Sequence, residues 1–302
     1  MKNTMITRGS GEVQRAVAAL AAGRMVVVVD DHDREDEGDL VLAADTATAQ
    51  QIAFVVANTT GIVCAPMPAE HADRLRLPPM TGDNTDPHGT AFTVTVDHVD
   101  CGTGVSAADR AHSLRALADP ATTPADLRRP GHVFPLRARE GGVLVRAGHT
   151  EAAVDLLRLA GRAPIGVISE IVDVDGSMRR GESLRAFAAE HDLPVLSIAE
   201  LVRYRRAEER LVEPVAWAEM PTEFGAFRAV AYRSVLDGTE HATCAGTRAA
   251  GSASATRSGP TPRRRRGATH STPTRPRGSR STRAATATVR RSSATSGSSG
   301  SG

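Results

Sequence analysis

Residues 26–39 read VVVVDDHDREDEGD, which is a run of four valines followed at once by seven carboxylates within ten residues. The valine run predicts a buried strand, because short runs of β-branched residues are typical of one. The acidic segment then falls at the strand's end, where charge repulsion is costly unless a cation, or an arginine such as Arg34, offsets it. Hard cations such as Mg²⁺ prefer oxygen ligands of this kind. A solvated acidic loop is the alternative interpretation.

Segments with helical and strand-like periodicity alternate along the chain. Helical spacing predicts helices over residues 13–20, 47–57, 106–117, 150–160, 183–191 and 199–210, with Ser106 and Thr150 as N-terminal caps. Strands are predicted over residues 25–29, 61–65, 91–96, 132–136, 142–145, 164–171 and 195–198. This interleaving indicates an α/β fold of the α+β type, a layered domain with a mixed twisted sheet flanked by helices.

Composition divides the chain into an acidic part and a basic tail. Residues 245–302 contain twelve arginines and no Asp or Glu, so removing them from the formal net charge of +2 leaves −10 for residues 1–244. Such an Arg/Ser/Thr/Gly-rich tail buries too little apolar surface to offset its chain entropy, and we expect it to be disordered. Residues 1–206 are long enough for one well-buried domain, with residues 207–244 as a separate region.

Cysteine usage and hydropathy exclude several classes of protein. The three cysteines have no CxxC spacing, so neither a disulfide framework nor a thiolate zinc site is indicated. Polar residues interrupt the N-terminal segment, which is therefore not read as a signal peptide. No run reaches the roughly 18 apolar residues of a membrane span. We expect a cytoplasmic protein that makes no membrane contact.

A second motif, Arg146-Ala147-Gly148-His149-Thr150, lies where a strand is predicted to lead into a helix. A helix N-terminus presents free N–H groups and the positive end of the helix dipole, which suits a phosphate. Gly148 lets a ligand approach the backbone, Arg146 adds a guanidinium and Thr150 a hydroxyl, while His149 can offer a nitrogen to a metal. The alternative is an ordinary helix cap with an exposed histidine.

Two further residues are candidates for moving protons. His132 enters an apolar strand from a tight turn, where a histidine is more often a hydrogen-bonded core residue. Glu170 ends the apolar run of residues 165–169, and a carboxylate in that position needs a partner or has a raised pKa. Such a group is a candidate acid or base, and a strand-end glutamate in solvent is the alternative. Cys64 is expected to be a buried small hydrophobe.

Several motifs together resemble one enzyme family. Residues 33–39, 61–64, 103–110, 129–136, 141–144 and 146–150 occur in the same order and spacing as in 3,4-dihydroxy-2-butanone 4-phosphate synthase, and the match runs from about residue 11 to residue 206. The resemblance implies a homodimer of mixed α/β fold that acts with Mg²⁺ or Mn²⁺. Its implied reaction converts D-ribulose 5-phosphate to L-3,4-dihydroxy-2-butanone 4-phosphate and formate, in riboflavin biosynthesis.

The resemblance also implies a role for individual residues. Carried over by position, Glu35 and His149 look like the metal ligands, and His132 and Glu170 match positions needed for catalysis. The positions that match substrate contacts are Arg34, Glu35, Asp39, Arg146, Ala147, Gly148, His149, Thr150 and Glu170.

The region after residue 206 resembles a different protein. Residues 211–241 are similar to the opening strands of GTP cyclohydrolase II, a family that needs a three-cysteine zinc site further on. Because Cys244 is the last cysteine, we expect only an N-terminal fragment of that domain in residues 207–244 and no GTP hydrolysis. The abrupt change of composition near Cys244 suggests that the tail is an out-of-frame reading of GC-rich DNA.

Two other functions compete with the lyase. The first is a bifunctional enzyme that also hydrolyses GTP, which the missing cysteines disfavour. The second is a nucleotide-binding or nucleic-acid-binding module that uses the basic residues 263–266 of the tail. No aromatic residue is interleaved there to stack on bases, so nucleic-acid binding is unlikely.

Overall fold

The computed structural model describes residues 6–246, with side chains from residue 11 onward. Two compact units divide the chain, Met1–Arg210 and Leu211–Gly302. The tail expected to be disordered lies outside the described residues from residue 247 on. None of the described helices is long and apolar enough to cross a membrane.

A mixed seven-stranded sheet forms the centre of the first unit, as the sequence predicts. Its strand order is β4-β5-β3-β6-β2-β1-β7. The β1/β7 and β3/β5 pairs are parallel, and the other neighbours are antiparallel. The strands are β1 Val26–Val29, β2 Gly38–Ala43, β3 Cys64–Pro68, β4 Val96–His98, β5 Leu127–Ala138, β6 Gly166–Glu170 and β7 Val195–Ser197.

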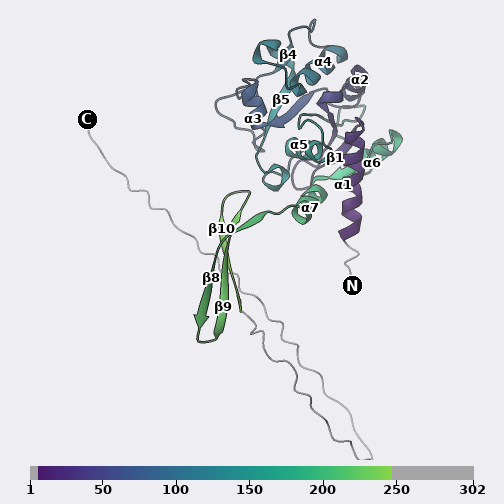
Figure 1. The fold of residues 1–302 in the computed structure, drawn as a ribbon. Helices are drawn as coiled ribbons and strands as arrows, with labels where there is room; N and C mark the ends of the chain where they lie inside the picture. The colour runs from purple at the N-terminus through teal and green to yellow at the C-terminus, as the bar shows by residue number, and fades with distance from the viewer. Residues whose placement is uncertain (1–5, 247–302) are drawn as a thin grey trace, which may run out of the picture. The chain divides into compact units, whose positions relative to one another are not determined.

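Helices cover both faces of this sheet (Figure 1). Helices α1, α5 and α7 pack on one face, and α2, α3, α4 and α6 pack on the other. The helices are α1 Ile6–Ala21, α2 Ala49–Asn58, α3 Ala69–Arg74, α4 Ala107–Ala118, α5 His149–Leu159, α6 Gly181–Glu190 and α7 Ile198–Glu208. Short 3₁₀ turns occur at η1 Ala44–Thr46, η2 Pro124–Asp126 and η3 Gly142–Leu144.

The valine run explains why the sheet needs two helical layers. Val26 and Val28 belong to the apolar cluster beneath α1, α5 and α7, whereas Val27 belongs to the cluster beneath α2, α4 and α6. All three side chains are fully buried. Successive side chains of a strand point to opposite faces, so an unbroken apolar strand is stable only when both faces are covered.

Three local predictions were wrong. Residues 142–145 form the 3₁₀ turn η3 rather than a strand, because Gly141 and Gly142 both adopt positive φ, 85° and 61°. Thr150 does not cap its helix: α5 begins at His149, with Gly148 in the capping position. The strand expected over residues 91–96 is reduced to isolated bridges at Phe92 and Thr93 before β4 begins.

Most predicted helices are confirmed, together with the signals that start them. The Ser106 hydroxyl accepts a hydrogen bond from the amide of Asp109 at 3.0 Å, so α4 starts where its cap predicts. At α2 the cap is Thr48, which forms a reciprocal capping box with Gln51. Such pairs satisfy amides that have no partner within the helix, which makes helix starts readable from the sequence.

The second unit contains a three-stranded antiparallel sheet of order β10-β9-β8. Its strands are β8 Val212–Thr222, β9 Gly225–Ser234 and β10 Glu240–Gly246. Every residue of β8 and β10 is exposed, and Trp217 keeps 68% of its surface accessible. This sheet therefore has no apolar core of its own among the described residues.

A buried ion pair holds α5 against α7 and the η3 turn. Oδ2 of Asp155 accepts hydrogen bonds from the amide of Val143 at 2.8 Å and from Nη1 of Arg205 at 2.6 Å. Nη1 of Arg205 also donates to the carbonyl oxygen of Gly141 at 2.9 Å. Only glycine fits at Gly142, because an added Cβ would lie 2.3 Å from the Asp155 carboxylate oxygens.

We expect Asp155→Ala to lower the free energy of unfolding of the first unit by about 2 kcal/mol, because the buried amide of Val143 loses its acceptor and Arg205 keeps only its more exposed partner, Glu209. Chemical denaturation of the whole chain measures this change. Arg203→Ala is the control, since its ion pair with Glu200 is largely exposed and contributes ~1 kcal/mol or less. Equal losses in the two variants would contradict the assigned role of Asp155.

Candidate active site

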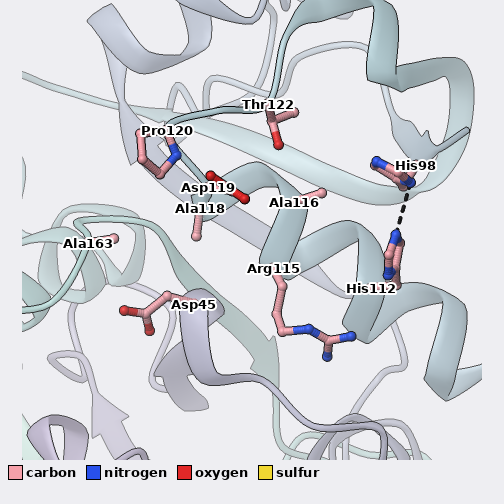
Figure 2. A pocket seen from close by; sticks show the side chains of 10 residues that line it. All are labelled: Asp45, His98, His112, Arg115, Ala116, Ala118, Asp119, Pro120, Thr122 and Ala163. Atoms are coloured by element: carbon pink, nitrogen blue, oxygen red, sulfur yellow. Dashed lines mark hydrogen bonds between the residues drawn. The ribbon is translucent and has the colours of Figure 1, made fainter. Parts of the chain in front are cut away.

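A cavity of about 200 Å³ opens on the α5 side of the sheet, beside the first turn of that helix. Seven of the residues singled out from the sequence line it, namely Arg34, Glu35, Asp39, Arg146, His149, Thr150 and Glu170. Its remaining lining residues are Glu37, Cys64, Thr90, Phe92, Leu136 and Ile168. A larger cavity of about 630 Å³ contains none of these residues (Figure 2).

The loop between β1 and β2 is organised by one buried carboxylate. Asp30 accepts hydrogen bonds from the backbone amides of Glu35 and Glu37 at 3.2 and 2.9 Å. Nη1 of Arg34 donates to Oδ2 of Asp30 at 2.8 Å and lies 2.8 Å from Oε2 of Glu35. Arg34 therefore offsets two of the clustered negative charges, and the loop holds the Glu35 carboxylate toward the cavity.

His149 adds a buried imidazole to this acidic cluster. Its Nδ1 lies 3.7 Å from Oε2 of Glu35 and 3.9 Å from Oδ1 of Asp39. Only 5% of His149 and 2% of Asp39 is exposed. Asp39 reaches the cavity because it shares a sheet face with Val41 and Ala43, whose side chains pack beneath α5.

Burial and mutual attraction shift the pKa values of these groups. The His149 imidazole, followed by the Arg34 guanidinium, lowers the pKa of Glu35 to about 2. Burial raises the pKa of Asp39 to about 7. Burial opposes a charge on His149, but the carboxylates of Asp39 and Glu35 outweigh it and raise its pKa to about 9. Positive charge is therefore stabilised at this point of the cavity.

These residues fit a divalent cation. Ligand atoms of Asp30, Glu35 and His149 lie within 4.8 Å of one another. Among the described side chains, Oδ1 of Asp39 and Nε2 of His149 are buried without a hydrogen-bond partner. Buried polar atoms are seldom left unpaired, so a missing ligand is a direct explanation for both. Asp30 already accepts three hydrogen bonds, so Glu35 and His149 are the better candidates for metal ligands.

The adjoining part of the cavity wall suits an anion. Arg146 is held by Glu151, whose Oε2 lies 2.6 Å from Nη1, and Nη2 donates to the Thr90 hydroxyl at 3.3 Å. The first turn of α5 points its N–H groups toward the same region. An added Cβ on Gly148 would lie 2.5 Å from Nη1 of Arg146 and 3.0 Å from Nη2 of Arg34. Glycine thus lets two guanidinium groups converge on one backbone position.

Glu170 lies directly beside Asp39, because the two residues are paired on the neighbouring antiparallel strands β6 and β2. Its Oε2 accepts a hydrogen bond from the Thr60 hydroxyl at 2.6 Å. The amide of Thr60 donates to the carbonyl oxygen of Glu170 at 2.9 Å, so the two residues are tied together twice. This hydroxyl is the partner that a carboxylate at the end of a buried strand requires.

Three of the singled-out residues, Ala147, Gly148 and His132, do not line the cavity. Ala147 is exposed and does not line the cavity, and Gly148 acts through its missing side chain. His132 is half-exposed, and its Nδ1 lies 2.7 Å from Oδ2 of Asp97. The amide of His132 also donates to Oδ1 of Asp97 at 2.9 Å. Both oxygens of one buried carboxylate therefore fix this histidine, away from the residues that surround His149.

Sequence reasoning missed the residues that support the site. Glu151, Thr60 and Asp97 hold Arg146, Glu170 and His132 in place. Asp97 and Thr60 are 35 and 110 residues from their partners along the chain, so no local pattern joins them. Glu151 had a readable signal, since an acidic residue in the first turn of a helix five residues after an arginine can reach back to it.

Comparison with known proteins identifies a match over most of the first unit. Residues 14–204 match the family described as 3,4-dihydroxy-2-butanone 4-phosphate synthase. A riboflavin biosynthesis protein RibBA from Salinispora arenicola is 58% identical over 232 residues, which cover 76% of this chain and 55% of that protein. The RibBA protein from Rhodococcus jostii is 55% identical over 232 residues, which cover 76% of this chain and 56% of that protein. This chain thus spans little more than half the length of these relatives.

Solved structures give the same match. A 3,4-dihydroxy-2-butanone 4-phosphate synthase in complex with two magnesium ions aligns with a TM-score of 0.63 at 44% identity, over 65% of this chain and 97% of that chain. RibBX, a two-domain 3,4-dihydroxy-2-butanone 4-phosphate synthase from A. baumannii, aligns with a TM-score of 0.72 at 40% identity. That second alignment covers 78% of this chain and 70% of the other.

We expect Glu151→Gln to lower the free energy of unfolding by about 2 kcal/mol, because the two carboxylate oxygens of Glu151 accept hydrogen bonds from Arg146 and from the amide of Arg139, and glutamine can accept only one of them. The matched control is Glu182→Gln, which changes an exposed glutamate in the first turn of α6 and so has the same effect on the helix dipole. Chemical denaturation compares the two variants. An equally large decrease in the free energy of unfolding of Glu182→Gln would show that the contact between Glu151 and Arg146 does not stabilise the protein.

Proposed function

Because the chain belongs to the 3,4-dihydroxy-2-butanone 4-phosphate synthase family, we propose that it converts D-ribulose 5-phosphate to L-3,4-dihydroxy-2-butanone 4-phosphate and formate in riboflavin biosynthesis. The observation that carries the proposal is one cavity lined by two unlike groups of residues. Glu35, Asp39 and His149 form a group suited to a cation, and Arg146 with the backbone at the start of α5 forms a neighbouring group suited to a phosphate. A phosphorylated sugar offers both groups within one small molecule.

Glu35 and His149 would hold the metal, which we propose to be Mg²⁺, with Mn²⁺ as a substitute. The solved synthase that contains two magnesium ions supports this choice for a related protein. When bound, a divalent ion supplies Lewis-acid polarisation of adjacent substrate oxygens. His149 has to be neutral to serve as a ligand, so its proton leaves when the ion binds.

The remaining residues position the substrate and hold its protons. Arg146 and the first turn of α5 bind the phosphate at a distance from the reacting carbons, and this binding energy orients the sugar. Asp39, with its pKa near 7, can hold or release a proton at neutral pH. Glu170 presents a second carboxylate on the same face of the sheet, steadied by the Thr60 hydroxyl.

The proposed catalytic role of His132 requires a second copy of the chain. Its imidazole does not line the cavity, although Asp97 fixes its orientation as a catalytic histidine requires. Exposed Ile62 and Val105, at 45% and 52% of their surface, lie in segments joined by the bond from Arg110 to the Gly61 carbonyl. In the proposed homodimer, these apolar residues meet the partner and His132 reaches the partner's cavity.

The substrate also supports the proposed location. A sugar phosphate is charged and does not cross a bilayer unaided, so an enzyme that consumes it works where it is made. We therefore propose that the protein acts in the cytoplasm.

We expect formate release from ribulose 5-phosphate in the presence of Mg²⁺, with loss of activity in EDTA and recovery when Mg²⁺ is restored. Glu35→Gln and His149→Asn each lower kcat by roughly a hundredfold or more, because each removes a charge-stabilising group at the reacting oxygens. Asp33→Asn is the matched control, since Asp33 is an exposed carboxylate of the same loop. Undiminished turnover in EDTA, or equal losses in all three variants, would refute the proposed site.

Mixing two inactive variants tests whether two chains share the site. Glu35→Gln and His132→Ala are each expected to be inactive as homodimers. After unfolding and refolding together, about half of the dimers are mixed and each contains one intact site, so about a quarter of wild-type activity returns. Light scattering checks that the species is a dimer. No recovery in a confirmed mixed dimer would show that each chain builds its site alone.

A further inference from the structure

A second cluster of metal-binding side chains lies on the opposite side of the sheet from the candidate active site. It consists of His98 at the end of β4, Asp100 in the following turn and His112 in α4. Each offers a ligand atom, and these atoms lie within 4.8 Å of one another. The two imidazoles face each other at one end of the cavity of about 630 Å³, as Figure 2 shows.

The hydrogen bonds define which nitrogen lone pairs face the space between the rings of His98 and His112. The amide of Asp100 donates to Nδ1 of His98 at 3.2 Å, so this nitrogen carries no proton. Nε2 of His112 lies 2.9 Å from the same Nδ1 and must therefore donate to it. The two rings thus share one proton between nitrogens that could both bind a metal.

The distances are close to those of a metal centre. Two nitrogens bound at about 2.0–2.1 Å to one tetrahedral ion lie roughly 3.3 Å apart, slightly farther than the present hydrogen bond. Oδ2 of Asp100 lies 3.7 Å from Nδ1 of His98. Movement of the proton of His112 from Nε2 to Nδ1, a small increase in the distance between the two nitrogens and a tilt of both rings would let both lone pairs converge on one ion. The Asp100 side chain is 77% exposed and free to close on it.

We propose that His98, Asp100 and His112 form a second metal site, which binds a transition-metal ion of the Zn²⁺ class and leaves its fourth position to water. Two imidazoles and one carboxylate are ligands typical of such ions, whereas Mg²⁺ prefers a full set of oxygen ligands. The site does not depend on the proposed catalytic activity, since none of its residues lines the candidate active site.

An ion at this position would cross-link three segments of the chain. It would join the end of β4, the turn after it and the second turn of α4. The segment between them contains Gly104, whose added Cβ would lie 1.9 Å from Oδ2 of Asp97 and 2.8 Å from Nδ1 of His132. An ion bound there would therefore restrain the loop that packs against His132.

Binding of Co²⁺ to the full-length chain tests the site. The background variant Glu35→Gln/His149→Asn removes the candidate active-site ligands, so Co²⁺ bound to it reports the second site. We expect one Co²⁺ per chain with the visible absorption of tetrahedral coordination, and displacement by Zn²⁺. Adding His112→Gln or His98→Gln is expected to weaken binding by about a hundredfold, and Asp100→Asn by about tenfold.

His241→Gln is the matched control, because it removes an exposed histidine of the second unit and leaves the cluster intact. Circular dichroism checks that each variant is folded, and Asp100→Asn keeps the test valid if a histidine variant unfolds. Zn²⁺ at about a hundred times its Kd should also raise the Tm of the background variant by about 5 °C or more. Absence of Co²⁺ binding to the background variant, or binding that persists unchanged without His98 and His112, would overturn the proposal.

Discussion

The attraction between one buried imidazole and the carboxylates around it is the interaction on which the rest of the site depends. The chain brings the partly buried Glu35 and the buried Asp39 to the end of a hairpin, where water screens their charges less than at the surface. His149 supplies the offsetting charge from a helix that begins more than one hundred residues later. Because a proton and a divalent cation can each provide that charge, the same arrangement that stabilises the protein without metal also suits the proposed metal site.

Helix α5 connects this site to the stability of the first unit. Its first turn carries His149 and Glu151, and its later part carries Asp155, whose ion pair holds α7 and the η3 turn. Both glutamate and aspartate are almost completely buried, and each has an arginine partner. A helix fixed at both ends by buried ion pairs keeps its N-terminus still, and a fixed N-terminus is what a phosphate-binding surface requires.

The histidines of this protein show that surroundings rather than residue type decide what a side chain can do. His149 is buried among carboxylates, which raise its pKa, whereas partial burial and the neighbouring His98 and Arg115 lower the pKa of His112. His132 lies between these cases, half-exposed but held at two atoms by Asp97. The His149 ring is therefore suited to a charged cluster, the His112 ring to a metal ion of the Zn²⁺ class, and the His132 ring to proton transfer.

The sequence by itself determined the type of most elements, the position of helix starts such as Ser106, and the residues that come together around Glu35 and His149. The element types and helix starts depend on local periodicity and on hydrogen bonds between neighbours in the chain, such as a cap and the third residue after it, whereas the grouping of Glu35 with His149 follows from the resemblance of several motifs to one family. It could not determine that β3 lies between β5 and β6, that residues 142–145 turn instead of extending, or that His132 lies away from the cavity. The tertiary structure decided these points, because strand order, the fit of Gly142 against Asp155 and the pairing of Asp97 with His132 arise only when distant segments bury their surfaces together.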